Sequence, residues 1–584
     1  MKKTVAIIFF SLFTGSLSAQ KTYPLYEYTE LTDTKPHHSD TIWRKQVKSP
    51  RLAWGSTDIR YPQQNIPAET FGTKTRLKGW KGERVNAQAV LWSAEELQES
   101  TLSLSPLVCG KDTLPTDAVS LHFVRYVMTD ELNKDGKGGC GHRPDKTEWD
   151  SSLVADPLDI VKARDVRACS VQPVWVNVWI PSTAKAGKYK GTLTVAGKNF
   201  APLQLALEIE VLNRTLPAPR TWRFHLDLWQ NPYAVARYYQ VPLWSDEHFE
   251  AMRPIMQKLA DAGQKVVTAT IMHRPWDGQT QDPFYSMVNK TKRIDGSWSY
   301  DYTVFDKWVG FMTEEIGIDR QINCYTMIPW SLQFDYYDEA TQTVQFVSAK
   351  PGEQAYEQYW SGFLSDFARH LKEKGWFEKT TISMDERDAD AMQEALKVIQ
   401  KADAGFKVSL AGNYHEELEP DLYDYCLAFG HNFPRPVKER RMQAGKKSTV
   451  YTCCTEAMPN VFTFSPPAEA NWLGWHVAAG GYDGYLRWAY NSWTEDPLRD
   501  SRFRSWAAGD CYLVYPGMRS SIRMERLIEG IQDCEKIWIL QQTLTGRKQQ
   551  EKLQQTVEMF TPEGLTREEI TPMVNRAREI LNSL

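Results

Sequence analysis

The sequence lacks the short motifs and long apolar runs that mark several common classes of protein. It has no CxxC pair and no HExxH pattern, so it carries no recognisable redox or zinc motif. After the first 20 residues no apolar stretch reaches 18 residues, so we expect no membrane-spanning helix in the mature chain. The formal net charge is only −4, which gives no electrostatic reason to expect nucleic acid or an anionic membrane as a partner.

Cysteine is sparse and irregularly spaced. The nine cysteines are an odd number and show no disulfide framework, so we expect most of them to be buried free thiols. The glycine-rich segment 134–142 lacks the Lys-Ser/Thr ending of a phosphate loop and the closing Glu of a calcium loop. We interpret it as a plain excursion of the chain.

The first 19 residues have the pattern of a secretory signal peptide. Lys2 and Lys3 form a charged start, residues 5–13 an apolar run, and residues 16–19 a small-residue cleavage region. The residue directly after Ala19 is Gln20 and not cysteine, so a bacterial lipoprotein anchor is not indicated. We therefore expect an exported bacterial protein, periplasmic or secreted, whose oligomeric state the sequence leaves open.

Residues 20–215 have the pattern of an antiparallel β-sandwich. Short segments rich in Val, Thr, Leu and aromatics alternate with turn residues. The segment 203–211 alternates with period two, and Leu205, Leu207 and Ile209 belong to its apolar set. The Pro-rich segment 216–220 is predicted to be a stiff linker.

After the linker the pattern changes to alternating strands and helices. Eight strands are expected at 223–228, 265–271, 321–327, 380–384, 406–411, 426–429, 448–453 and 484–489. Such repetition over residues 221–517 predicts a (β/α)8 barrel. Residues 518–584 are predicted to be helical and to pack on the barrel, with the charges of 521–540 on a solvated face.

The segment 379–387 concentrates the chemistry. A short apolar strand runs into Asp385 and Glu386, and helix-forming residues follow. Active sites of such barrels lie at the carboxyl ends of the strands, so we interpret Glu386 as a general acid/base and Asp385 as its partner. Neighbouring strand residues point to opposite faces, so both can reach one substrate only if the chain already turns there. The plain alternative is a solvated turn with an N-cap Asp, and similar acidic pairs occur elsewhere in the chain.

Other polar and aromatic residues gather at or just beyond the ends of the predicted strands. Aromatics make up 12% of the chain, and its 22 tryptophans are a high load. Ring faces with amide and imidazole groups suit a sugar, which has apolar ring faces and hydroxyls. The candidate sugar-binding residues are Trp229, His273, Tyr325, Asn413, Tyr451, Trp488, Tyr490 and Trp493.

Several segments together resemble glycoside hydrolase family 123. They are the β-domain, the linker, and the segments 226–232, 383–387, 484–493 and 521–530. The family consists of exo-acting β-N-acetylgalactosaminidases with an Asp-Glu pair at the end of a barrel strand, which Asp385 and Glu386 match. The resemblance implies a glycan substrate with terminal β-linked N-acetylgalactosamine, on a glycolipid or an oligosaccharide. It also implies substrate-assisted catalysis through an oxazolinium ion, with no cofactor or metal.

Two alternatives stay open. The first is a retaining glycosidase in which Glu386 is the acid/base and Glu456, after the seventh strand, is a protein nucleophile. The second is an exported sugar-binding protein without catalysis.

Overall fold

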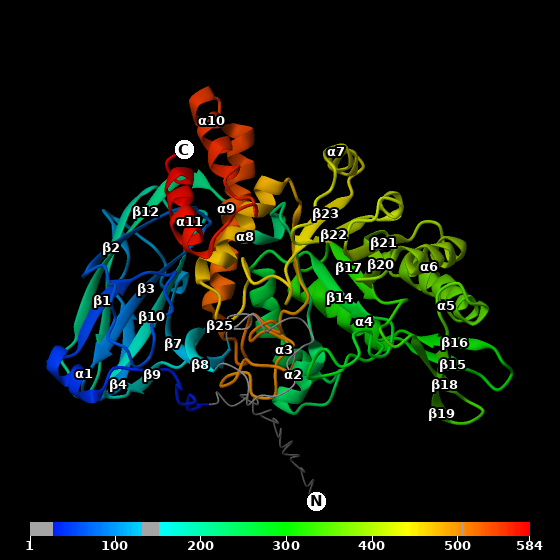
Figure 1. The fold of residues 1–584 in the computed structure, drawn as a ribbon, viewed down its shortest axis with the longest axis horizontal. Helices are drawn as coiled ribbons and strands as arrows, with labels where there is room; N and C mark the ends of the chain where they lie inside the picture. Colours follow the sequence, from blue (N-terminus) through cyan, green and yellow to red (C-terminus); the bar gives the residue numbers. More distant parts are fainter. Residues whose placement is uncertain (1–26, 131–150, 505) are drawn as a thin grey trace, which may run out of the picture.

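The computed structural model of the chain describes residues 27–130, 151–504 and 506–584. The predicted signal peptide and the glycine-rich segment 134–142 lie outside the described residues. Figure 1 shows a β-sandwich on one side, a barrel on the other, and C-terminal helices beside both. Within the part of the chain that is described, no helix is both long and apolar enough to cross a membrane.

The N-terminal region is the predicted sandwich, preceded by helix α1 (Asp40–Gln46). One sheet has the order β1-β3-β10-β7-β8-β25 and the other β2-β12-β11-β4-β9, with β5 and β6 beside β11. The strands are β1 (Arg51–Gly55), β2 (Lys74–Lys81), β3 (Arg84–Ser93), β4 (Leu97–Leu104), β5 (Val108–Cys109), β6 (Asp112–Thr113), β7 (Val119–Thr129), β8 (Ser152–Leu158), β9 (Ala163–Val166), β10 (Ser170–Trp179), β11 (Gly187–Ala196) and β12 (Leu203–Thr215). All these pairings are antiparallel except β2 with β12.

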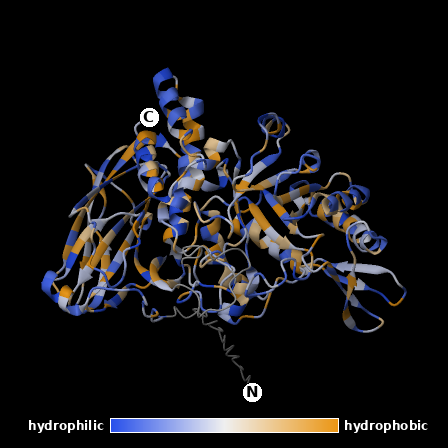
Figure 2. Cartoon of the chain, viewed as in Figure 1, coloured by the Kyte–Doolittle hydropathy of each residue, from blue (hydrophilic) through white to orange (hydrophobic). Residues whose placement is uncertain are grey.

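The alternation predicted for β12 is confirmed. Leu205, Leu207, Ile209 and Val211 are buried between the two sheets, and the residues between them are exposed or half-buried. In Figure 2 the sandwich strands accordingly alternate between orange and blue, whereas the strands at the centre of the barrel are mostly orange. Barrel strands are covered on both faces and need an almost continuous apolar sequence.

All eight predicted barrel strands are present and parallel, in the order β13-β24-β23-β22-β21-β20-β17-β14. They are β13 (His225–Leu228), β14 (Val266–Thr270), β17 (Gln321–Tyr325), β20 (Thr380–Asp385), β21 (Lys407–Gly412), β22 (Asp424–Ala428), β23 (Lys447–Tyr451) and β24 (Gly484–Arg487). The sheet nearly closes between β13 and β14. There the Lys265 N–H donates to Leu226 O at 3.0 Å, and the Gln264 side chain accepts from Leu228 N–H at 3.0 Å.

Helices follow the strands as expected for this fold. They are α2 (Pro232–Tyr239), α3 (Asp246–Ala260), α4 (Thr303–Gly310), α5 (Gln354–Glu373), α6 (Ala389–Ala402), α7 (Arg435–Gln443) and α8 (Pro467–Gly480). Helix α6 begins at an N-cap, because the Asp388 side chain accepts from the Ala391 N–H at 2.8 Å. The N-cap of α6 therefore lies two residues after Glu386.

A small four-stranded sheet at the barrel mouth was not predicted. The connections after β14 and β17 contribute two strands each, in the order β16-β15-β18-β19. The strands are β15 (Asn289–Lys292), β16 (Trp298–Asp301), β18 (Gln333–Asp338) and β19 (Thr343–Ser348). We call these four strands the side sheet. It projects from the barrel in Figure 1 and belongs to the end where the strands finish, which we call the mouth.

The C-terminal region is helical as predicted, and it contacts the sandwich as well as the barrel. Strand β25 (Ser520–Ser521) pairs with β8 of the sandwich. This short strand, which follows the barrel in the sequence, therefore joins the N-terminal sheet. Helices α9 (Ile522–Thr543), α10 (Arg547–Val557) and α11 (Arg567–Leu581) follow. Helix α9 crosses α8 so closely that a Cβ on Gly474 would lie 2.1 Å from Gly530 O.

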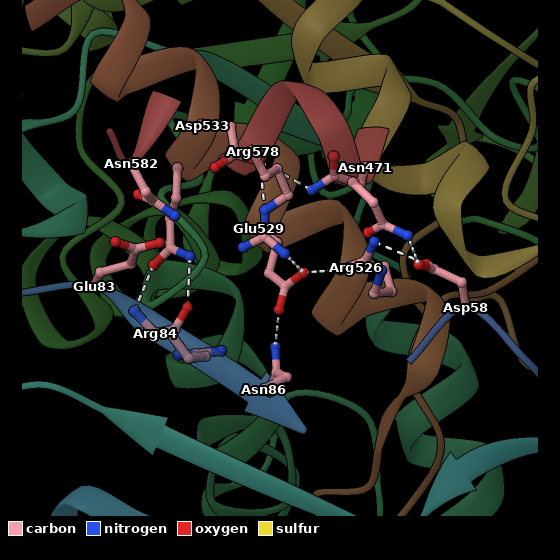
Figure 3. A network of polar contacts seen from close by, with 12 residues as sticks. Asp58, Glu83, Arg84, Asn86, Asn471, Arg526, Glu529, Asp533, Arg578 and Asn582 are labelled. Atoms are coloured by element: carbon pink, nitrogen blue, oxygen red, sulfur yellow. Dashed lines mark hydrogen bonds and ion pairs between the residues drawn. The ribbon is translucent and has the colours of Figure 1, made fainter. Parts of the chain in front are cut away.

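The expectation of a solvated charged face on 521–540 is wrong. The charged side chains of α9 are buried between the sandwich and the barrel. Figure 3 shows Glu529 accepting from Asn86 at 2.8 Å and from Arg578 at 2.9 Å, while Arg526 pairs with Asp58 at 2.8 Å. Buried charges persist only when they are paired, so this network ties α9 to the sandwich.

Candidate active site

The strand β20 ends in a turn that brings two carboxylates to the mouth. Asp385 is its last residue, and Glu386 has a left-handed backbone with φ of 48°. The Glu386 N–H donates to Ala411 O at 2.8 Å, which ties the turn to β21. A non-glycine residue in this conformation is uncommon and tends to occur where a site demands it. The turn required by the sequence argument is therefore present between the two residues.

Glu386 is held by a tyrosine from the opposite part of the sheet. Tyr451, the last residue of β23, donates its hydroxyl to Glu386 Oε1 at 2.8 Å. Burial and the Glu386 charge raise the pKa of Tyr451, so its hydroxyl stays a donor. Glu386 is exposed to solvent and Tyr451 is buried, which leaves the carboxylate accessible at the mouth.

Asp385 lies in a less solvated position than Glu386. Burial, followed by the neighbouring Glu386, raises the pKa of Asp385 to about 7, while Arg387 and the Trp276 indole lower it. The buried Trp276 N–H has no hydrogen-bond partner of normal geometry among the described residues. The indole N–H is thus directed at Asp385 and favours its charged form.

An aromatic cluster forms a wall at the mouth. The name aromatic cluster is used for Trp229, Tyr233, Trp276, Phe284, Tyr325 and Tyr451. Trp488 packs against them. The Trp229 and Trp276 rings stack with centroids 5.0 Å apart, and the Tyr325 ring lies 4.5 Å from Trp229. The predicted residues Trp229, Tyr325, Tyr451 and Trp488 are therefore brought together.

A cavity of about 620 Å³ opens beside the pair, over the ends of β20 to β23. Its lining includes Glu386, Tyr451 and Asn413, which places the predicted Asn413 at the site. Glu456 also lines it. The Glu456 carboxylate accepts from the Cys453 N–H at 2.7 Å and from the Thr455 hydroxyl at 2.5 Å.

A buried arginine holds two parts of the mouth together. Arg487, the last residue of β24, donates to Thr452 O at 2.9 Å and to Asn460 Oδ1 at 2.6 Å, and pairs with Asp510. Asp510 in turn accepts from the Trp488 indole at 3.2 Å. The sequence analysis missed this role. A lone arginine inside an apolar strand was the available signal, since a buried charge requires partners.

The structure corrects two candidate sugar-binding residues. Tyr490 and Trp493 have 0% exposed surface. The Tyr490 hydroxyl donates to Ile255 O at 2.8 Å, and the Trp493 indole donates to Val514 O at 2.8 Å. They pack in the barrel core and offer no ring face to a ligand.

His273 lies apart from the aromatic cluster, against the side sheet. Its ring is 5.5 Å from that of Tyr285 and 5.8 Å from that of Phe346 on β19. The backbone N–H of His273 donates to Asp335 Oδ1 at 3.1 Å. This arrangement makes His273 a joint between the barrel and the side sheet.

The remaining chemistry-bearing groups are consistent with a site made of carboxylates and aromatics. Within the described ranges, no three His, Cys, Asp or Glu side chains are grouped to hold a metal ion. Seven cysteines are free thiols, five of them buried, and Cys454 is disulfide-bonded.

Comparisons with known proteins identify the family. Residues 229–540 match the model "Glycoside hydrolase 123, catalytic domain", and residues 54–197 match "Glycoside hydrolase 123 N-terminal domain". Among solved structures, a family 123 glycoside hydrolase from Clostridium perfringens, studied for glycolipid glycan hydrolysis, is similar with a TM-score of 0.82. The identity is 25%, over 92% of this chain and 98% of that one.

A family 39 glycoside hydrolase from Bacteroides cellulosilyticus also matches, with a TM-score of 0.33 and 9% identity over 78% of this chain and 81% of that one. No curated protein matches the sequence.

Proposed function

The chain belongs to glycoside hydrolase family 123, and from its site we propose that it is an exo-acting retaining enzyme that removes terminal β-linked N-acetylgalactosamine. We propose substrate-assisted catalysis through an oxazolinium intermediate. The observation that carries the proposal is the pair at the end of β20, with Glu386 turned to φ 48° beside Asp385 and bound by Tyr451.

The less solvated carboxylate suits the orientation of the acetamido group. Asp385 would accept the acetamido N–H, which turns the carbonyl oxygen toward C1 of the sugar. That oxygen attacks C1 and forms the oxazolinium ion, whose positive charge the Asp385 carboxylate stabilises. The aromatic cluster would cover the ring face of the sugar, and the Trp276 N–H would help to hold Asp385 in its charged form.

The exposed carboxylate suits proton transfer to the leaving group. Glu386, when protonated, would donate its proton to the glycosidic oxygen as the C1–O bond breaks. Glu386 would then remove a proton from the water that attacks C1 and opens the oxazolinium ion. The product keeps the β configuration, because C1 is attacked twice from opposite faces.

The proton shared by the pair would change place when substrate binds. In the free protein burial, followed by the neighbouring Glu386, raises the pKa of Asp385 to about 7 and so favours its neutral form. An acetamido N–H on Asp385 favours its charged form and leaves the proton on Glu386. The acid is thus ready only when the correct group occupies the site.

A second candidate mechanism has a specific observation in its favour. Glu456 lines the same cavity as Glu386, so it could serve as a protein nucleophile. Its two hydrogen bonds to its own loop hold the carboxylate in place. This mechanism requires no acetamido group on the substrate.

Hydrolysis of matched aryl glycosides tests the proposal. We expect release from aryl β-N-acetylgalactosaminide, weaker release from the β-N-acetylglucosaminide, and none above background from the β-galactoside. Cleavage of the β-galactoside at an equal rate would overturn substrate assistance and favour Glu456.

A further inference from the structure

Trp330 presents an exposed aromatic face next to the carboxylate pair. It lies in the connection between β17 and the side sheet and is 43% exposed. The guanidinium carbon of Arg387 lies 4.1 Å from the centroid of its ring. Arg387 is the residue directly after Glu386, so the ring stands one side chain away from the proposed acid.

Both members of this contact are fixed to elements of the site. The Arg387 Nε donates to Ile328 O at 2.8 Å, in the same connection as Trp330. The backbone N–H of Trp330 donates to Pro275 O at 3.3 Å, and Pro275 precedes Trp276 of the aromatic cluster. The ring contact with Arg387 therefore holds Trp330 to the turn that carries the pair. The backbone hydrogen bond holds Trp330 to the loop that carries Trp276. A stacked guanidinium also restricts the ring, since cation–π contacts favour one face.

The direction of the leaving group follows from the acid. The glycosidic oxygen must lie within hydrogen-bond distance of Glu386 to receive its proton. Glu386 and Arg387 both line the 620 Å³ cavity, as does Tyr451, whereas the less solvated Asp385 lies beside Trp276 of the aromatic cluster. A glycan that continues from the terminal sugar past Glu386 comes next to Arg387, whose guanidinium lies against the Trp330 ring.

We propose that Trp330 and Arg387 form a leaving-group subsite that binds the sugar next to the terminal residue. The Trp330 ring stacks on the apolar face of that sugar, and Arg387 donates to its hydroxyls. The subsite selects a glycan leaving group over a small one. This inference rests on the proposed function and names a substrate feature that the carboxylate pair does not determine.

Two substrates separate this subsite from the terminal-sugar site. The first is an oligosaccharide with β-linked N-acetylgalactosamine on galactose, and the second is β-N-acetylgalactosaminyl fluoride, whose leaving group is a single atom. For Trp330→Ala we expect kcat/KM for the oligosaccharide to fall about fivefold, mostly through KM, since stacking is worth ~1 kcal/mol. We expect kcat/KM for the fluoride and the inhibition constant of a thiazoline analogue of the oxazolinium ion to stay within about twofold.

The matched controls are Trp330→Phe and Trp298→Ala. Trp330→Phe keeps a ring and should restore most of the oligosaccharide rate. Trp298 is 36% exposed on β16 and packs on Tyr336 of the side sheet, so Trp298→Ala should change neither substrate. Unchanged melting temperatures would show that the variants are folded.

The outcomes distinguish a failure of the leaving-group subsite from a failure of the proposed function. If Trp330→Ala leaves the oligosaccharide rate unchanged, or lowers both substrates equally, the subsite is wrong and the proposed function stands. If the wild-type enzyme cleaves neither substrate, the proposed function fails and the subsite with it.

Discussion

The Tyr451 hydroxyl donates to Glu386 Oε1 across 2.8 Å, and so joins the end of β23 to the turn after β20. These residues are 65 positions apart in the sequence. The contact fixes the rotamer of an otherwise exposed carboxylate. It also places a hydroxyl donor beside the carboxylate that we propose as the acid.

Removing that hydroxyl should slow the enzyme without unfolding it. We expect Tyr451→Phe to lower kcat on aryl β-N-acetylgalactosaminide about 10- to 100-fold, because a hydrogen bond to a charged group contributes ~1.5–3 kcal/mol. Steady-state kinetics measures the loss. Tyr337→Phe, on the exposed face of β18, is the matched control and should keep the full rate. Equal rates for Tyr451→Phe and wild type would contradict the role.

The pH profile should depend on the charge of Glu386. Burial, followed by ionised Glu386, raises the pKa of Asp385 to about 7, so the wild-type pair keeps a proton up to about pH 7 and kcat/KM should fall above it. In Glu386→Gln the negative neighbour is gone, so the pKa of Asp385 falls. Residual hydrolysis of an activated aryl substrate should then begin at lower pH and show no alkaline decline. An alkaline decline that persists unchanged in Glu386→Gln would exclude the pair as its source.

Two tryptophans from the same stretch should behave differently. Trp488 packs on the aromatic cluster, so Trp488→Ala should lower kcat/KM. Trp493 is fully buried, so Trp493→Ala should lower the free energy of unfolding by ~3–5 kcal/mol. Below its melting temperature, folded Trp493→Ala should keep a near-normal kcat/KM. Kinetics and urea unfolding of both variants decide the matter, and a folded Trp493→Ala with greatly raised KM would place that residue back at the site.

The buried network at α9 should matter for stability and not for chemistry. Glu529 accepts from Asn86 and pairs with Arg526 and Arg578, so Glu529→Ala removes a buried carboxylate that these two cations share and leaves Arg526 with Asp58 and Arg578 with Asp533. We expect a loss of ~3–5 kcal/mol in the free energy of unfolding. Glu95→Ala, which removes the exposed pair with Arg44, should cost less than ~1 kcal/mol. Similar losses for the two variants would show that the network contributes little.

The barrel could be predicted from sequence because its strands and helices carry local periodic signals. β20 and α6 are examples, and the Asp385–Glu386 pair falls at their junction. The side sheet lacked such a signal, because its strands are short and partly polar.

Residues that depend on distant partners could not be placed this way. The charges of α9 look solvated until Asp58 and Glu83, more than 400 positions away, are brought beside Arg526 and Lys536. Trp493 follows a strand end just as Trp488 does. The chain beyond β24 turns inward there because Asn491 Oδ1 accepts from the Asn231 N–H at 2.9 Å and Asn491 donates back to Asn231 O.

The rates of two variants on substrates with two different leaving groups test substrate-assisted catalysis most directly. The measurement is kcat of Asp385→Asn and Glu386→Gln on a nitrophenyl and on an alkyl β-N-acetylgalactosaminide. We expect Glu386→Gln to lose far less activity on the nitrophenyl substrate, since general acid help is worth about 10²- to 10⁴-fold only where the leaving group needs a proton. Asp385→Asn should lose activity on both substrates alike, while Glu456→Gln, as the control, keeps most of it. An inactive Glu456→Gln, together with an Asp385→Asn that retains its activity, would contradict substrate assistance and assign the nucleophile to Glu456.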